Sequence, residues 1–304
     1  MKTNTMKRSL MFAATVAILL AAVSCSPAET SFSFAFLTDT HLQPEKNAQD
    51  GFKLAIEKVN ELAPNFVLTG GDQVFDAFDQ SFERADLLYS LYLKASKLLD
   101  VPVYNTMGNH DIFGLGENAG VDPEHPEAGK NMFANRQAEN RYYSFEHEGW
   151  HFMVLDSVQP IEGGSYRGGI DAGQKAWVTE ELGKLEAGTP IVLSTHIPFI
   201  SVSFQLREPR GEYRDNGLLI DNAVEVLNLF KGHNLRLVLQ GHLHAYEDIY
   251  FRGIRFVTGG AVSANWWDGP LREMEEGFLM VRIKGDRIDC EYIDYGWEPV
   301  AEEE

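Results

Sequence analysis

Cysteine and positively charged residues are both scarce in this sequence. Its 304 residues include two cysteines, Cys25 and Cys290, which excludes a fold held by several disulfides. Twenty-six lysines and arginines stand against 45 aspartates and glutamates, a formal net charge of −19. A chain this acidic repels polyanions, so no binding to nucleic-acid polymers is expected. A small phosphorylated substrate is still compatible, because a bound metal ion reverses the local field.

Long uncharged apolar stretches are missing beyond the N-terminus. Lys2, Lys7 and Arg8 form a basic start, and residues 9–24 are uncharged and mostly apolar. This pattern predicts an export signal rather than a spanning helix. Small residues before Cys25 resemble a bacterial lipoprotein processing site, although Ala22 stands where leucine is usual. The alternative is an ordinary secretory signal with an incidental cysteine.

The lipoprotein interpretation sets the expected organisation of the chain. Residues 1–24 would be the signal peptide, and residues 25–31 a tether with its lipid on Cys25. Residues 32–296 would form one catalytic domain, and residues 297–304 an acidic tail. We expect an exported protein of the bacterial cell envelope, anchored to a membrane at its periplasmic or outer face.

Short apolar runs alternate with helical patterns after the tether, which predicts a layered α/β domain with parallel strand pairs. The predicted strands are residues 32–37, 66–69, 101–107, 152–156, 191–195 and 235–240. Apolar residues at i, i+3, i+4 and i+7 predict helices around 52–59, 88–95 and 223–230, with a weaker one around 178–185. Residues 142–145 and 151–156 predict a hairpin that makes the sheet mixed. Residues 114–141 and 201–216 lack periodicity, as functional or mobile loops do.

Polar side chains follow directly after five of these strands. They are Asp39 and His41, Asp72, Asn109 with His110 and Asp111, His196, and His242 with His244. The carboxyl ends of strands in an α/β sheet line one crevice, so these segments should converge there. On extended backbone, residues two apart point the same way, which predicts that each Asp-x-His or His-x-His pair shares a direction. The glycines before Asp72, Asn109 and His242 would let the backbone turn and leave space.

Seven of these side chains are oxygen or nitrogen donors suited to metal: Asp39, His41, Asp72, Asn109, His196, His242 and His244. One catalytic ion takes three or four protein ligands, so seven donors predict two ions. Because the set has no cysteine, Mn, Fe or Zn fits better than a metal that prefers soft ligands.

The ordered series Asp39-x-His41, Gly71-Asp72, Gly108-Asn109-His110-Asp111, lone His196 and Gly241-His242-x-His244 resembles the calcineurin-like metallophosphoesterases. The resemblance runs from about residue 32 to about residue 295 and implies a layered α/β/β/α fold. It implies that Asp39, His41 and His244 bind one metal, that Asn109, His196 and His242 bind the other, and that Asp72 bridges both. It further implies attack of a metal-bridging hydroxide on a phosphomonoester or phosphodiester. His110 would stabilise developing charge or protonate the leaving oxygen.

Two branches of that family differ from this chain near the site. Purple acid phosphatases have glycine in place of His41 and tyrosine in place of Phe75. Protein serine/threonine phosphatases have Asp-Arg-Gly where this chain has Phe75-Asp76-Ala77. Either Asp111 or Asp76 could therefore be the group that orients His110. On local pattern alone, Asp76 and Asp79 are expected at the start of a helix.

Two further groups are candidates for the substrate rim. Trp266 and Trp267 could stack on a base or sugar, or could pack the sheet against a helix. Arg207, Arg210 and Arg214 could meet an anionic part of the substrate, or could belong to a solvated loop.

The expected function is metal-dependent hydrolysis of phosphoesters outside the cytoplasm. One alternative is a metal-binding or carrier lipoprotein without turnover. A zinc peptidase is a weaker alternative, because the His-Glu-x-x-His signature is missing.

Overall fold

The computed structural model describes residues 30–138, 140–203 and 217–299. Several predicted features lie outside these described residues, namely the signal peptide, Cys25, Arg207, Arg210, Arg214 and the chain from residue 300. What was expected of them therefore stays a prediction. In the part of the chain that is described, no helix is both long and apolar enough to cross a bilayer.

Two mixed sheets form the centre of the molecule. The first has the order β13-β12-β1-β2-β3, and the second the order β10-β11-β9-β8-β5-β4. The first contains β1 (Ser31–Leu37), β2 (Phe66–Thr69), β3 (Val103–Tyr104), β12 (Phe278–Lys284) and β13 (Arg287–Ile293). The second contains β4 (Tyr143–His147), β5 (Trp150–Val154), β8 (Pro190–Ser194), β9 (Asn234–Gln240), β10 (Tyr246–Phe251) and β11 (Ile254–Gly259). A separate hairpin pairs β6 (Val158–Ile161) with β7 (Ser165–Gly168).

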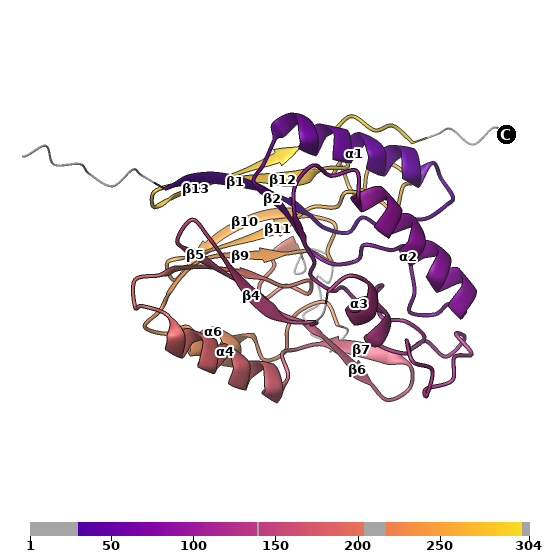
Figure 1. The fold of residues 1–304 in the computed structure, drawn as a ribbon, viewed down its shortest axis with the longest axis horizontal. Coiled ribbons are helices and arrows are strands. Elements are labelled where there is room, and N and C mark those ends of the chain that lie inside the picture. Colours follow the sequence, from indigo (N-terminus) through magenta and orange to yellow (C-terminus); the bar gives the residue numbers. More distant parts are fainter. Residues whose placement is uncertain (1–29, 139, 204–216, 300–304) are drawn as a thin grey trace, which may run out of the picture.

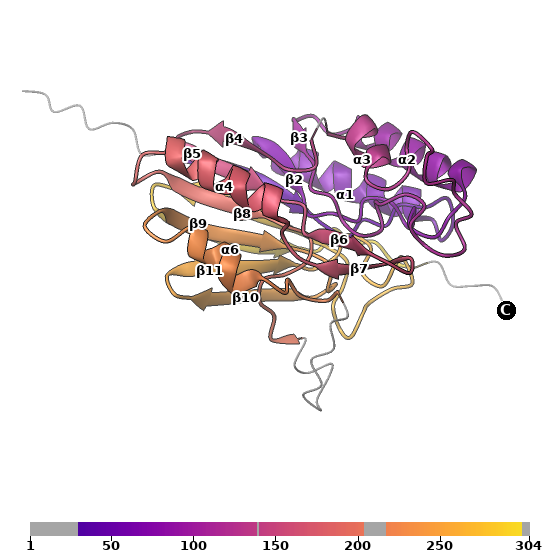
Figure 2. The ribbon, with the colours of Figure 1, turned by 90° about the horizontal axis from the view of Figure 1, so that it is seen from below.

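Helices cover the outer faces of the two sheets (Figure 1). Helices α1 (Ala48–Leu62) and α2 (Phe82–Ser96) lie over the first sheet, and α4 (Ala172–Lys184) and α6 (Ala223–Leu229) over the second (Figure 2). A short helix, α3 (Asn131–Arg136), lies within the segment that showed no periodicity. The result is the expected α/β/β/α architecture.

Strand β1 shows how the sequence builds these layers. Its phenylalanines Phe32, Phe34 and Phe36 are buried in the cluster between the two sheets, while Ala35 and Leu37 join the cluster on the helix side. Phe34 stacks on Phe66 of β2 with ring centroids 4.9 Å apart. Each fully buried phenylalanine contributes about 1.5–3 kcal/mol of transfer free energy. Burial on both faces fixes where β1 ends, and therefore where Asp39 lies.

Several predicted elements are confirmed and some are wrong. The hairpin is confirmed as β4 paired with β5. The strand expected at 101–107 is only two residues long, because Thr106 N donates to the Thr69 hydroxyl and not to a strand backbone. Asp76 and Asp79 do not begin α2, which is capped by Ser81, whose hydroxyl accepts from Arg84 N. Asp79 accepts instead from the amide of Asn118.

The C-terminal boundary of the domain also differs from expectation. Trp297, placed in the acidic tail on sequence grounds, is buried. Its ring packs edge-on against Trp267, with centroids 5.2 Å apart. The packed domain therefore extends at least to Trp297.

Candidate active site

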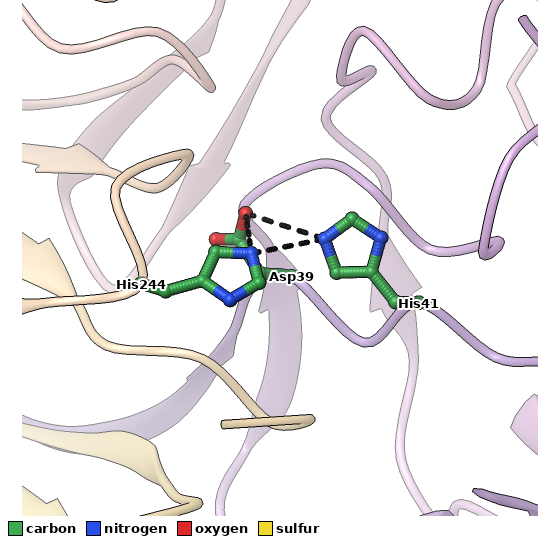
Figure 3. Close-up of side chains that lie close together, drawn as sticks. All are labelled: Asp39, His41 and His244. Carbon is green, nitrogen blue, oxygen red and sulfur yellow. Dashed lines mark hydrogen bonds and ion pairs between the residues drawn. The ribbon is translucent and has the colours of Figure 1, made fainter. Parts of the chain in front are cut away.

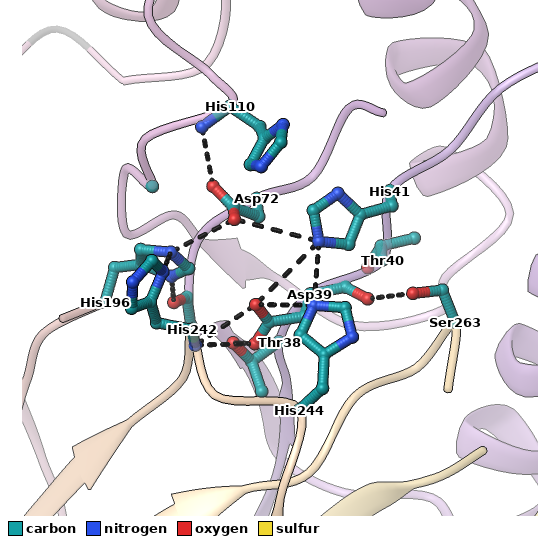
Figure 4. Close-up of polar contacts among 12 residues, drawn as sticks. Thr38, Asp39, Thr40, His41, Asp72, His110, His196, His242, His244 and Ser263 are labelled. Atoms are coloured by element: carbon teal, nitrogen blue, oxygen red, sulfur yellow. Dashed lines mark hydrogen bonds and ion pairs between the residues drawn. The ribbon is translucent and has the colours of Figure 1, made fainter. Parts of the chain in front are cut away.

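The predicted polar residues come together where β1, β2, β8 and β9 end (Figure 4). Both sheets contribute, because β1 and β2 belong to the first and β8 and β9 to the second. All seven predicted metal ligands and His110 lie in this one cluster, which we call the polar cluster. Most of them are buried, and Asp39, His41 and His196 are fully so.

The sequence analysis assumed an extended backbone at these residues. The backbone at the polar cluster is not extended. Asp39, His41, Asp72, His242 and His244 have φ values of 54°, 46°, 53°, 71° and 48°. These left-handed conformations cost energy in residues with a Cβ and concentrate at functional sites. The consequence is that His242 and His244 diverge into different halves of the cluster, so the shared direction predicted for that pair is wrong.

Asp39, His41 and His244 form one half of the cluster (Figure 3). The Nε2 atoms of His41 and His244 lie 3.0 Å apart, and Asp39 Oδ1 lies 3.4 Å from His244 Nε2 and 3.9 Å from His41 Nε2. Three ligand atoms therefore face a common point.

Asp72, Asn109, His196 and His242 form the other half. His196 Nε2 lies 3.1 Å from Asp72 Oδ2 and 3.0 Å from Asn109 Oδ1. Asp72 Oδ2 also lies 3.7 Å from His41 Nε2 in the first half. Asp72 is thus the carboxylate placed between the two halves.

Hydrogen bonds on the far side of three imidazoles fix their orientation. Nδ1 of His41 bonds to the carbonyl of Phe75 at 3.3 Å, that of His196 to Gly70 at 2.8 Å, and that of His244 to Ala264 at 2.6 Å. A carbonyl only accepts, so each Nδ1 carries a proton and each Nε2 faces the cluster. This arrangement is typical of histidines that bind metals.

Electrostatics favour a cation at the polar cluster. Burial lowers the pKa of His41 and of His242 to about 3, so both are neutral near pH 7. Burial opposes charge on His196, but Asp72 raises the pKa of His196 to about 9. Burial likewise opposes ionisation of Asp72, but His196 and His110 hold the pKa of Asp72 well below its usual range. A divalent ion would take the place of the proton that His196 shares with Asp72.

Glycine is required at two positions beside the cluster. A Cβ on Gly108 would lie 2.1 Å from Oδ1 of Asp72, and one on Gly241 would lie 2.1 Å from the hydroxyl of Thr38. Both glycines therefore leave space, as predicted, and a side chain at either position would displace the neighbouring carboxylate or threonine.

His110 faces Asp76 rather than Asp111. Its Nδ1 lies 3.5 Å from Oδ1 of Asp76. Burial opposes charge on His110, but Asp72 and Asp76 raise the pKa of His110 to about 8. Oxygens of Asp111 accept from the backbone amides of Asp72, Gln73 and Gly108, at 2.8–2.9 Å. Asp111 therefore positions the loops of the cluster, and Asp76 is the carboxylate that faces the ring of His110.

The segment 261–267 supports the Asp39 half from outside. Ser263 donates to the carbonyl of Asp39 through its hydroxyl at 2.8 Å, and the carbonyl of Ala264 accepts a hydrogen bond from Nδ1 of His244. Trp267 is buried, with 2% of its surface exposed, and its Nε1 donates to the carbonyls of Thr40 and His41. Trp267 is thus a packing residue. Trp266 is half-buried at the rim, with its ring centroid 4.5 Å from that of His244.

Tyr166 is a site neighbour that the sequence analysis missed. It lies on β7, with its ring 6.3 Å from His242 and 5.9 Å from Phe78. Burial and the charge of Asp72 raise the pKa of Tyr166, which keeps its phenol protonated. A lone tyrosine in a short hairpin carries no sequence pattern that would have indicated this position.

The residues of the cluster suit a pair of metal ions. Among the described residues, Asp39 and Asp72 are buried carboxylates with no lysine or arginine partner, and their charged neighbours are the histidines of the cluster. Buried charges are either paired or bound to metal, and a metal ion would replace the protons on those histidines. Nε2 of His242 is buried without a hydrogen-bond partner in that same part of the chain. Oxygen and imidazole donors match the borderline metals expected from the sequence.

A model of the calcineurin-like phosphoesterase family matches residues 32–246. The chain belongs to this family. It is a phosphoester hydrolase whose chemistry depends on two divalent metal ions, and its substrates are small phosphorylated compounds. Membership favours hydrolysis over the metal-carrier alternative.

Individual relatives are distant. A probable cyclic nucleotide phosphodiesterase of Xenorhabdus bovienii is 21% identical over 245 residues, which cover 77% of this chain and 87% of the relative. A dimetal phosphatase from Danio rerio has the same fold, with a TM-score of 0.59 and 14% identity over 87% of this chain and 99% of that one. A purple acid phosphatase from yellow lupin, Lupinus luteus, aligns with a TM-score of 0.56 and 15% identity over 87% of this chain and 52% of its own. Its likeness extends to the fold alone, since His41 and Phe75 depart from the pattern of that branch.

Proposed function

We propose that this hydrolase cleaves phosphodiesters, cyclic nucleotides among them, and that it acts in the bacterial cell envelope as a lipoprotein. The observation that carries the reaction is the polar cluster, in which three backbone-oriented imidazoles and two buried carboxylates face a common space. The preference for diesters is supported by the similarity to the Xenorhabdus protein. The missing Asp-Arg-Gly of protein phosphatases favours a phosphodiester or a small phosphomonoester over a phosphoprotein.

Each side chain of the polar cluster has a role in this proposal. Asp39, His41 and His244 would hold one ion, Asn109, His196 and His242 the other, with Asp72 between them. When bound, such a pair of ions polarises phosphoryl oxygens and lowers the pKa of a water molecule. Ions held by these residues would position the substrate phosphorus for in-line attack.

His110 then protonates the leaving group. Asp72 and Asp76 raise the pKa of His110, which favours its protonated form, and Oδ1 of Asp76 lies 3.5 Å from its Nδ1. As the bond from phosphorus to the leaving oxygen breaks, the His110 proton passes to that oxygen, and the product alcohol departs neutral. An ester of an ordinary alcohol gains most from this step, because its leaving group would otherwise depart as a strongly basic alkoxide.

The test is metal content combined with hydrolysis by the purified protein. After chelation, Mn, Zn, Fe or no metal is added, and bis-nitrophenyl phosphate is compared with nitrophenyl phosphate. We expect about two ions per chain and metal-dependent release that is faster from the diester. Faster release from the monoester would overturn the diester preference, and two bound ions with no release from any ester would favour the carrier alternative.

Location is tested separately, through Cys25. A Cys25→Ser variant should move from the membrane fraction to the soluble envelope fraction, with its hydrolytic rate unchanged. Retention of the variant in membranes would contradict a lipid anchor on Cys25.

A further inference from the structure

Two aromatic rings flank the polar cluster at different ends. Trp266 lies against the Asp39 half, with its ring centroid 4.5 Å from His244 and 5.7 Å from His41. Tyr166 lies beside His242 in the other half. A phosphoryl group held by the cluster therefore has an aromatic wall on either side, and its organic substituent must lie beyond the cluster.

Trp266 is the ring better placed to receive that substituent. Tyr166 and Trp266 are both half-buried, but Tyr166 packs against Phe78, and a Cβ on Gly217 would lie only 2.7 Å from its ring, so neighbouring chain occupies part of its surface. Within the described residues, the ring of Trp266 contacts those of His41 and His244. Indole presents the largest flat apolar surface of any side chain, and bases stack on such rings whatever their identity.

The turn that carries Trp266 holds it in one position. Ala264, Trp266 and Trp267 have φ values of 47°, 49° and 71°, and Asn265 N donates to the carbonyl of Gly269. Trp267 ties the turn to the backbone of Thr40 and His41. Because the indole is held in advance, little entropy is lost when a ligand stacks on it.

We propose that Trp266 is the residue that selects the substrate, by stacking on a flat heteroaromatic group that a phosphodiester carries close to its phosphorus. A nucleoside 3′,5′-cyclic phosphate has this chemistry, because its base is attached to the sugar that closes the phosphate ring. The inference rests on the proposed phosphodiesterase function and adds to it the group that is recognised.

The test compares kcat/KM for 3′,5′-cyclic AMP with kcat/KM for the same cyclic sugar phosphate without the base. Stacking on an aromatic side chain is worth about 1–3 kcal/mol per base, so wild-type protein should prefer the nucleotide by roughly tenfold or more. Trp266→Ala should reduce that preference to about twofold or less by slowing only the nucleotide, while Trp266→Phe keeps most of it. All variants should retain the wild-type metal content.

Tyr250→Ala serves as the matched control, because Tyr250 lies on β10 with 74% of its surface exposed. It should keep the wild-type preference. Tyr166→Leu should slow both substrates to a similar degree.

The following results would overturn the inference while the proposed function stands. They are a wild-type enzyme that cleaves both cyclic esters equally well, a preference that survives Trp266→Ala, and a preference that disappears in Tyr166→Leu instead. Equal loss of both substrates with loss of metal in Trp266→Ala would also overturn it, since Trp266 would then only support His244. Failure of the wild-type protein to cleave any phosphoester with any metal would reject the proposed function itself.

Discussion

Oδ1 of Asp76 lies 3.5 Å from Nδ1 of His110, whereas the oxygens of Asp111 accept from the backbone amides of Asp72, Gln73 and Gly108. The choice between two carboxylates that the sequence left open is thereby made by position. Asp76 also accepts a hydrogen bond from Phe78 N at 2.9 Å, which holds the carboxylate in place.

Loss of charge at Asp76 should impair turnover without loss of metal. Asp76→Asn keeps the shape of the side chain but no longer stabilises a protonated His110, so we expect kcat to fall about tenfold, as for other groups that orient a catalytic side chain. KM and the metal content should stay at their wild-type values. Steady-state kinetics and elemental analysis measure both, and an unchanged kcat would contradict the assignment.

His110→Ala should lose turnover and keep both ions. Removal of a general acid typically costs 10²–10⁴-fold in rate. One nitrogen of His110 lies within 4.8 Å of ligand atoms of His41 and Asp72, so a ligand role makes a competing prediction, loss of metal. Metal content of the variant decides between them. His233→Ala, on a half-buried histidine before β9, should change neither quantity.

The two carboxylates of the cluster should differ in how much metal depends on them. Asp72 lies between the halves, so Asp72→Asn should weaken both ions, whereas Asp39→Asn should weaken one and leave about one per chain. Titration with metal followed by elemental analysis measures the difference. Equal stoichiometry in the two variants would argue against a bridging role for Asp72.

Glu276 should make stability depend on pH. Burial raises the pKa of Glu276 to about 7, and the charges of Asp294 and Glu275 act in the same direction. Its ordinary value is 4.5, so between about pH 4.5 and 7 the folded state binds more protons than the unfolded state, and stability falls as pH rises. Glu276→Gln removes that loss and should raise Tm relative to wild type by roughly 5 °C or more at pH 8, with little gain at pH 4.5. Thermal unfolding at the two pH values tests this, with the exposed Glu273→Gln as control.

The sequence predicted the structure best at the strand ends, where a buried apolar run is followed directly by metal-binding side chains. β1 could be located because its residues are apolar on both faces, and the abrupt change to Thr38-Asp39 marks its end. The polar cluster followed because each strand ends in a donor. Backbone conformation at Asp39 and His242 could not be predicted, since left-handed φ values arise from tertiary contacts and not from local propensity.

Other positions depended on contacts distant in sequence. Trp266 and Trp267 are neighbours with the same side chain, yet one faces the cluster and the other packs against Trp297. The local sequence pattern predicted Asp76 at the start of a helix. Its place beside His110 became clear only from the 3.5 Å distance between the two side chains. Tyr166 became visible only when the β6–β7 hairpin was placed beside His242.

The direction of β1 has a consequence for how the enzyme meets its substrate. The chain enters β1 at Ser31 and reaches Asp39 at the opposite end, roughly 25 Å further on at about 3.3 Å per residue. A molecule held to a surface by its N-terminus would turn that surface toward the start of the strand and present the catalytic crevice to the surrounding fluid. Compounds that diffuse freely would then be within its range, whereas phosphate groups embedded in the supporting bilayer would lie beneath it, out of reach.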